Sequence, residues 1–301
     1  MRSYIRHGTD QCKLIKILCS DRDKFRFISS FINSSNKSTI FKQFFYFENI
    51  ESTQDFAHKL LKGRDEFYPS VIISDFQTGG KGRRGPNWAS PKGGIWMSLT
   101  LETNLKTQEL FRILMLVTRS LCQTLEIHTK LISMVKWPND ILINGKKVAG
   151  ILLDADVESD SIKQVIIGIG VNSNNDLEST RLMIKKKNNG ISDYDITTIK
   201  YENQNTEISN LDFIQYFLHS IDDSFQDLMS NEFIEELTIY YKNKIMESQR
   251  HLKYMFSIGD NKFNGEIVKI HNDGSLLVKN LESIHNGDLI RINSVYDLNQ
   301  P

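Results

Sequence analysis

The chain has 301 residues, a length that can bury a substantial core and allows two domains. Its 37 lysine and arginine residues are balanced by 37 aspartate and glutamate residues, so the composition does not favour bulk electrostatic binding to nucleic acid or a membrane surface. No apolar run reaches the length of a membrane span, and the N-terminus lacks the apolar core of a secretory signal.

The cysteines, Cys12, Cys19 and Cys122, are odd in number and lack metal-ligand spacing. Such usage is typical of reduced thiols in a reducing compartment, which predicts a cytoplasmic protein. Arg2 and Arg6 leave import into an organelle open, although the acidic residues that follow are unusual for a transit peptide.

Residues 1–42 are predicted to be an N-terminal extension of unknown role, with a candidate strand at residues 14–18. We find no helix there with basic and polar residues on one face, so no DNA-recognition helix is expected.

Residues 43–250 alternate between strand-like and helix-like segments and are predicted to form one domain. Apolar patterns predict strands at residues 44–47, 71–76, 95–101, 132–136, 141–143, 147–153 and 162–171. A capping-box sequence predicts a helix after Ser52, and helical spacing of apolar residues predicts helices at 109–126, 211–228 and 231–245. The segment 174–189 is rich in asparagine and lysine and is predicted to be a loop.

A tight hairpin is predicted where Asn144-Gly145 separates two strand segments. Strict alternation after this turn places two sets of residues on opposite faces: Lys147, Ala149 and Ile151, and Val148, Gly150 and Leu152.

Residues 251–301 differ in pattern from the preceding domain. Short strand-like runs at 263–270, 276–281 and 289–292 are separated by Asn- and Gly-containing turns. Short strands separated by such closely spaced turns predict a separate small antiparallel barrel.

A basic glycine-rich loop at residues 77–88 follows one predicted strand. It places Gly80, Gly82 and Gly85 around the cations Lys81, Arg83 and Arg84. The glycines satisfy a dinucleotide-binding pattern, but Pro86 and Asn87 follow where that motif requires a helix, and no P-loop Gly-Lys-Ser/Thr is present. Two interpretations stay open: a solvated basic turn, or a flexible loop that closes over an anionic, nucleotide-like ligand.

Five sequence blocks resemble the biotin protein ligases. They are Ser52-Thr53, the loop Gly80 to Gly85 with Trp88, Lys136-Trp137-Pro138-Asn139-Asp140, Lys147-Val148-Ala149-Gly150, and Gly168-Ile169-Gly170-Val171-Asn172. The blocks occur in the family's order, and the likeness spans residues 44–292. Lys81 stands where most members carry arginine, and Gln54 stands where they carry asparagine.

The resemblance implies an α+β fold: a mixed or antiparallel sheet with helices on one side, of the class II synthetase-like biotin/lipoate ligase type, plus a C-terminal SH3-like β-barrel. It implies an enzyme that uses ATP and Mg²⁺ to form biotinyl-5'-AMP from biotin. That enzyme would transfer biotin to a lysine of the biotin carrier domain of a biotin-dependent carboxylase. We expect a monomer or weak homodimer that binds neither nucleic acid nor membrane.

The resemblance also implies site residues. Lys147, expected to point inward, and Arg83 would be catalytic. Biotin would contact Ser52, Thr53, Gln54, Gln77, Gly80, Lys81, Gly82, Arg83, Lys147 and Gly150. ATP and the adenylate would contact Arg83, Arg84, Gly85, Trp88, Lys136, Asn139, Asp140 and Asn172, with Asn139 and Asp140 near the metal.

Two alternatives stay open at this point. A lipoate protein ligase would share the fold and the adenylation step, and a nucleic-acid-binding protein would use the basic loop without catalysis. The neutral charge balance does not favour the second.

Overall fold

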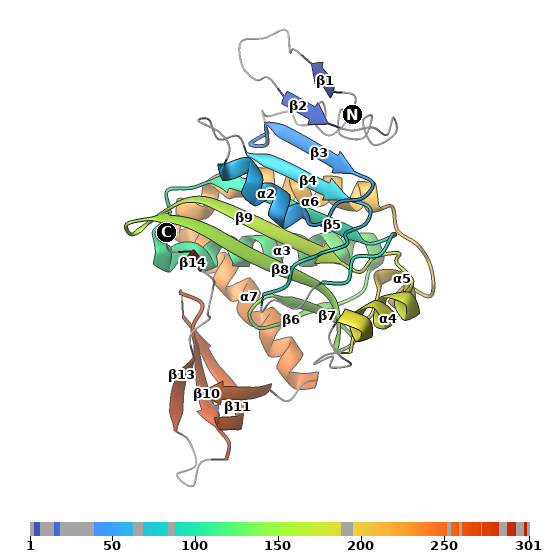
Figure 1. Ribbon diagram of the computed structural model, residues 1–301. Coiled ribbons are helices and arrows are strands. Elements are labelled where there is room, and N and C mark those ends of the chain that lie inside the picture. Colours follow the sequence, from blue (N-terminus) through green and yellow to red (C-terminus); the bar gives the residue numbers. More distant parts are fainter. Residues whose placement is uncertain are drawn as a thin grey trace.

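The structure is a computed structural model, and it describes residues 3–6, 15–18, 39–62, 69–83, 88–187, 195–251, 254–258, 261–271, 273–282, 288–292 and 298–299. Over these residues the chain forms a ten-stranded sheet and a separate four-stranded sheet. Figure 1 shows the small sheet at one end of the molecule, beyond the helices that cover the large sheet.

The large sheet is mixed, as predicted. Its strands are β1 (Ser3–Arg6), β2 (Ile15–Leu18), β3 (Gln43–Phe47), β4 (Ser70–Ser74), β5 (Ile95–Glu102), β6 (Ser133–Lys136), β7 (Asp140–Ile143), β8 (Lys146–Glu158), β9 (Ser161–Val171) and β14 (Leu298–Asn299). They lie in the order β1-β2-β3-β4-β5-β9-β8-β7-β6, and β14 pairs with β8. Strands β2, β3 and β4 are parallel, as are β14 and β8, whereas the other neighbouring strands are antiparallel.

Three long helices cover one face of this sheet: α3 (Leu110–Thr129), α6 (Asn210–Ser224) and α7 (Asn231–His251). Alternate residues of the central strands, such as Met97 and Leu99 of β5, pack into their apolar core. This arrangement confirms the predicted helical layer. On the opposite face, α2 (Thr53–Lys62) packs Ala57 in a smaller apolar cluster with Ile72 and Ile166.

The remaining helical segments are short or peripheral: η1 (Thr107–Glu109), α4 (Leu177–Lys187), α5 (Ile199–Glu202) and η2 (Phe225–Met229). The prediction of a loop at residues 174–189 was wrong, because α4 occupies most of that segment. Its weak apolar pattern explains the error: Leu177 is buried, but Leu182 is 57% exposed. No helix in the described part of the chain combines the length and apolarity needed to span a membrane.

The small sheet is antiparallel and consists of β10 (Tyr254–Ile258), β11 (Asn261–Ile270), β12 (Leu276–Asn280) and β13 (Leu289–Ile292), in that order. It matches the predicted small C-terminal β structure and adds β10, which the sequence pattern did not indicate. The Trp137 indole Nε1 donates a 3.0 Å hydrogen bond to the Gly274 carbonyl, which joins this sheet to the turn between β6 and β7.

The hairpin of β7 and β8 forms as predicted, with positive φ angles of 50° at Asn144 and 76° at Gly145. The predicted alternation after it was wrong. Ile141 pairs with Ala149 but Leu142 pairs with Lys147, so the register shifts by one residue at Val148. Val148 and Ala149 are therefore both buried in the core.

Because of this bulge, Lys147 shares a face with Gly150 rather than with Ala149. A Cβ atom built on Gly150 would lie 3.3 Å from Lys147 Cε. Lys147 therefore points to the same side of the sheet as Gly150, and the bulge rather than simple alternation sets this direction.

Candidate functional site

The site begins at the N-terminus of α2, on the face of the sheet opposite the long helices. Ser52 Oγ caps the helix by accepting a 3.2 Å hydrogen bond from Asp55 N. Gln77 Oε1, from the loop after β4, accepts hydrogen bonds from Thr53 N at 2.8 Å and Thr53 Oγ1 at 3.1 Å. Gln77 Nε2 donates to Ser90 Oγ at 2.8 Å. Gln77, at the start of the glycine-rich loop, therefore links the N-terminus of α2 to Ser90, which lies just after that loop.

Gln54 extends this polar cluster across the sheet. Its Nε2 donates to Asp154 Oδ2 at 2.8 Å, and its Oε1 lies 3.0 Å from Ser98 Oγ. A Cβ atom on Gly168 would lie 2.7 Å from the same Oε1, so the glycine makes room for the glutamine. His58 Nε2 also lies 2.8 Å from Asp154 Oδ2.

The number of hydroxyl hydrogens in this polar cluster limits which ligand groups it can bind. Ser98 Oγ lies 2.9 Å from Thr53 Oγ1 and 3.0 Å from Gln54 Oε1, and Thr53 Oγ1 lies 3.1 Å from Gln77 Oε1. Two hydroxyl hydrogens must serve these three oxygen–oxygen contacts. The hydroxyl hydrogens are therefore used within the cluster. Gln77 Oε1 already has two donors, Thr53 N and Thr53 Oγ1, whereas Gln54 Oε1 has at most one and can accept a further hydrogen bond. Such a cluster favours a ligand that brings N–H donors.

Sequence reasoning gave no role to Ser90, Ser98 or Asp154, which form hydrogen bonds with the predicted residues Gln54 and Gln77. A signal for one of them was available, because the alternation of β5 puts Ser98 on the face opposite Met97 and Leu99. Asp154 was not accessible in this way, since its partner Gln54 is 100 residues earlier in the chain.

The Trp88 indole lies on a floor made by two strand glycines. Cβ atoms on Gly150 and Gly170 would lie 2.8 Å and 2.6 Å from its ring atoms. Lys147 Nζ is 4.9 Å from the centre of the ring, a distance typical of a cation–π contact. Trp88 Nε1 is buried and has no hydrogen-bond partner among the described residues.

Lys147 also forms an ion pair with Asp140, across the hairpin. Its Nζ is 2.6 Å from Asp140 Oδ1, and the two side chains are only 16% and 11% exposed. The neighbouring Asn139 accepts a 2.8 Å hydrogen bond from Arg83, and its amide donates to the Ile151 carbonyl at 2.6 Å. These contacts place Arg83, from the basic loop, beside the hairpin that carries Lys147.

The other loop residues are placed in part. Trp88 N donates to the Gly80 carbonyl at 2.7 Å, and a Cβ atom on Gly80 would lie 2.6 Å from both Trp88 O and Ser90 Oγ. Lys81 pairs with Asp55 at 3.2 Å, and Gly82 is half-buried beside it in the loop. Arg84 and Gly85 lie outside the described residues.

Lys136 and Asn172 lie near the same region. Lys136 is the residue opposite Asp140 in the β6–β7 pairing, so it borders the turn that contains Asn139. Asn172 is 3% exposed and follows β9 directly, and its backbone N donates to Val148 O at 2.8 Å. Its Oδ1 lies 3.4 Å from Asn175 Nδ2.

The predicted metal role of Asn139 and Asp140 does not fit this geometry. Asn139 Oδ1 accepts a hydrogen bond from Arg83, and Asp140 Oδ1 pairs with Lys147, so both side-chain oxygens face cations. Within the described ranges, no group of three His, Cys, Asp or Glu side chains is arranged to hold a metal ion. A hard divalent ion often takes few protein oxygens when substrate phosphates supply the others. We therefore assign no chemical step to a protein-bound metal.

Comparison with known proteins places the chain in a family. Residues 46–172 match the model of the biotin/lipoate A/B protein ligase family. Over 248 residues the chain is 32% identical to the bifunctional ligase/repressor BirA of Bacillus spizizenii, and the match covers 79% of the chain and 70% of that relative. The chain belongs to the biotin/lipoate A/B protein ligase family.

Other relatives agree with this placement. A biotin–[acetyl-CoA-carboxylase] ligase of Paracoccus denitrificans is 33% identical over 124 residues, covering 40% of the chain and 51% of that protein. The structure of a biotin protein ligase from Aquifex aeolicus in complex with biotin and ATP superposes with a TM-score of 0.59 at 23% identity. That superposition covers 84% of the chain and all of the Aquifex chain, and it confirms the predicted fold.

Proposed function

We propose that this protein is a biotin protein ligase, which forms biotinyl-5'-AMP from biotin and ATP and then biotinylates a lysine of a carrier domain. Family membership and the names of the relatives support this proposal. One structural observation carries it: Lys147 lies between the Trp88 ring and the Asp140 carboxylate, beside the turn that Arg83 contacts.

The chemistry requires activation of an unreactive carboxylate. A carboxylate oxygen of biotin attacks the α-phosphorus of ATP, and pyrophosphate leaves with the electrons of the broken P–O bond. The product is a mixed anhydride. The amine of a carrier lysine then attacks the acyl carbon, the amide forms with loss of a proton, and AMP departs.

The protein contributes charge and position in this scheme. The Lys147 ammonium has three N–H donors, one of which faces Asp140. In the ligand complex this ammonium would bridge the biotin carboxylate and the α-phosphate, which otherwise repel each other. Arg83, with Arg84 and the amides of the loop, would hold the phosphate. The closed loop would exclude water from the anhydride.

Biotin fits the polar cluster better than lipoate does. The hydroxyl hydrogens of Thr53 and Ser98 are used within the cluster, and both acceptor positions of Gln77 Oε1 are filled, whereas Gln54 Oε1 can accept a further hydrogen bond. The ureido ring of biotin carries two N–H groups, either of which can donate to this oxygen. The dithiolane ring of lipoate carries no N–H group, so it could not use the remaining acceptor capacity of Gln54.

The test is exchange of pyrophosphate into ATP by the purified protein, with biotin or lipoate as the cosubstrate. We expect biotin-dependent exchange and no exchange with lipoate. A second assay then follows biotin transfer to the carrier domain of a biotin-dependent carboxylase, with a carrier whose acceptor lysine is changed to arginine as the control. Exchange supported by lipoate alone would reject the proposal in favour of a lipoate ligase.

We further propose that the protein acts in the cytoplasm as a monomer or weak homodimer, with no nucleic-acid partner. The Bacillus spizizenii relative is named a ligase/repressor, so DNA binding needs a direct test. A gel shift with DNA that weakens as salt rises would contradict this part of the proposal.

A further inference from the structure

A short segment beside β8, residues 195–198, holds the backbone of Lys147 on the side away from β7. Lys147 N donates to the Asp195 carbonyl at 2.9 Å, and Thr197 N donates to the Lys147 carbonyl at 2.9 Å. Ile196 thus pairs with Lys147 as a parallel bridge. Strand β9 cannot fill this place, because its pairing with β8 ends where Val171 meets Ala149.

The same segment also reaches the end of β9. Immediately after it, Ile199 N donates to the Asn172 carbonyl at 2.9 Å, and Lys200 N donates to the Ser173 carbonyl at 2.9 Å. The segment therefore links the backbones of two predicted site residues, Lys147 and Asn172.

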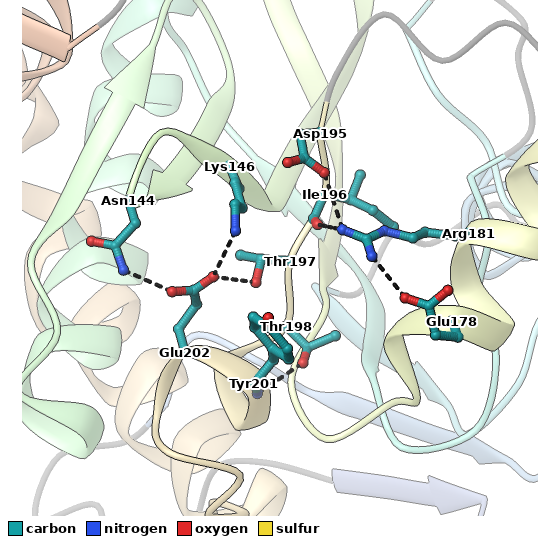
Figure 2. A network of polar contacts seen from close by, with 10 residues as sticks. All are labelled: Asn144, Lys146, Glu178, Arg181, Asp195, Ile196, Thr197, Thr198, Tyr201 and Glu202. Carbon is teal, nitrogen blue, oxygen red and sulfur yellow. Dashed lines mark hydrogen bonds and ion pairs between the residues drawn. The ribbon is translucent and has the colours of Figure 1, made fainter.

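Glu202, at the end of α5, ties this segment to the hairpin. Figure 2 shows its carboxylate between three partners. Oε1 accepts from Thr197 Oγ1 at 2.6 Å, and Oε2 accepts from Asn144 Nδ2 at 2.7 Å. Lys146 Nζ lies 3.8 Å from Oε1. The Glu202 side chain is 8% exposed and Thr197 is fully buried, so solvent cannot readily replace the bond between these two residues, whereas Asn144 is exposed.

A second set of contacts, made by Arg181, holds the Asp195 end of the segment but is more exposed. Arg181 of α4 bonds Asp195 Oδ1 at 3.1 Å and Glu178 Oε1 at 2.7 Å, as Figure 2 shows. The Arg181 and Asp195 side chains are 35% and 59% exposed, so this ion pair stabilises the segment less than the Glu202–Thr197 hydrogen bond does.

From this geometry we infer that Glu202 is a positioning residue for Lys147. Its carboxylate holds residues 195–198 through Thr197 and the hairpin turn through Asn144 and Lys146. These two elements flank Lys147, so Glu202 orients the Lys147 ammonium toward the reacting anions. The inference rests on the proposed function, since it gives Lys147 a role in adenylation. The contacts of Glu202 with Thr197, Asn144 and Lys146 make its proposed effect on the reaction an indirect one, through Lys147.

The first test compares Glu202→Ala with Glu202→Gln in biotin-dependent pyrophosphate exchange. Displacement of a reacting group by about 1 Å can cost on the order of 10²-fold in rate, so we expect Glu202→Ala to lower kcat by about 10-fold to 100-fold, with a smaller change in KM for biotin. Glu202→Gln can still bond Asn144 and Thr197 and should retain most of the turnover. The matched control is Glu207→Ala, which removes only an exposed ion pair with Lys200.

The second test is a double-mutant cycle with Lys147→Ala. If Glu202 acts through Lys147, then Glu202→Ala should cost little further activity once the ammonium is gone. An equal fold loss in both backgrounds would show that Glu202 acts independently of Lys147, and would overturn the inference.

The third test does not depend on activity. Amide hydrogen exchange at Lys147 and Thr197 should accelerate in Glu202→Ala but not in Glu207→Ala, at equal global stability. Unchanged exchange at both amides would refute the anchoring of Lys147. If the unmodified protein showed no biotin-dependent exchange, the proposed function would fail, while this measurement would still decide whether Glu202 anchors the Lys147 backbone.

Discussion

Replacing Lys147 by methionine tests whether this residue serves catalysis or only stability. The change keeps a long unbranched side chain but removes the ammonium from Asp140, which lies 2.6 Å away and is 11% exposed. At an effective dielectric constant of about 20, the gross attraction across this distance is about 6 kcal/mol. The desolvation of both ions offsets much of it.

Removing one partner leaves a buried charge without compensation, which typically costs about 3–5 kcal/mol. Because both side chains keep some exposure, we expect a loss near the lower end, about 3 kcal/mol in the free energy of unfolding. A domain of this size is usually stable by about 5–15 kcal/mol, so the variant should still fold. Urea denaturation should show a lower midpoint with an unchanged slope.

The double variant Asp140→Asn/Lys147→Met separates the two roles. It replaces the ion pair by neutral groups, so the free energy of unfolding should return to within about 1 kcal/mol of the unmodified protein. Biotin-dependent pyrophosphate exchange should stay reduced by on the order of 10²-fold or more, the scale of losing one preorganised charged group. If exchange recovered together with stability, Lys147 would be a structural residue and the proposed mechanism would be wrong.

Three other changes test separate parts of the site and the fold. Gly170→Ala places a Cβ atom 2.6 Å from the Trp88 ring, so the indole must move. Overpacking of this kind costs about 1–3 kcal/mol. If that cost falls on ATP binding, KM for ATP in the exchange assay should rise by about 10-fold or more. Arg83→Gly removes the bond to Asn139 and a phosphate donor, so released adenylate should biotinylate bystander lysines; unchanged labelling of a non-cognate protein would contradict this role. Burial raises the pKa of Asp222 above its ordinary value of 3.8, so the folded state holds this proton more tightly and loses stability as pH rises through the raised pKa. Asp222→Asn should therefore gain stability relative to the unmodified protein between about pH 4 and pH 7 in urea titrations, and a constant difference would refute the shift.

The sequence predicted the features that depend on neighbouring residues. The cap at Ser52 and the Asn144-Gly145 turn were both predicted from local chemistry, and the structure confirms them. The bulge at Val148 was not predicted, although two adjacent apolar residues, Val148 and Ala149, interrupt the alternation there.

What the sequence could not give is the long-range pairing that assembles the polar cluster. Ser98 faces Gly168 because β5 and β9 pair in one particular register. That register brings Gln54 into reach of both Ser98 and Asp154. The register of this pairing is set by the packing of the whole sheet rather than by any local motif, so these contacts could not be predicted from the sequence.

The hairpin that carries Lys147 is held by the fold, and this determines which part of the site can close. The Tyr241 hydroxyl of α7 donates to the Pro138 carbonyl, and Trp137 bonds the small sheet at Gly274. A Cβ atom on Gly274 would lie 2.2 Å from the Phe111 ring, so the small sheet packs against the long helices with no room to spare. Because the hairpin is held in this way, the proposed function requires that closure over the adenylate come from the basic loop, whose described cations Lys81 and Arg83 contact Asp55 and Asn139.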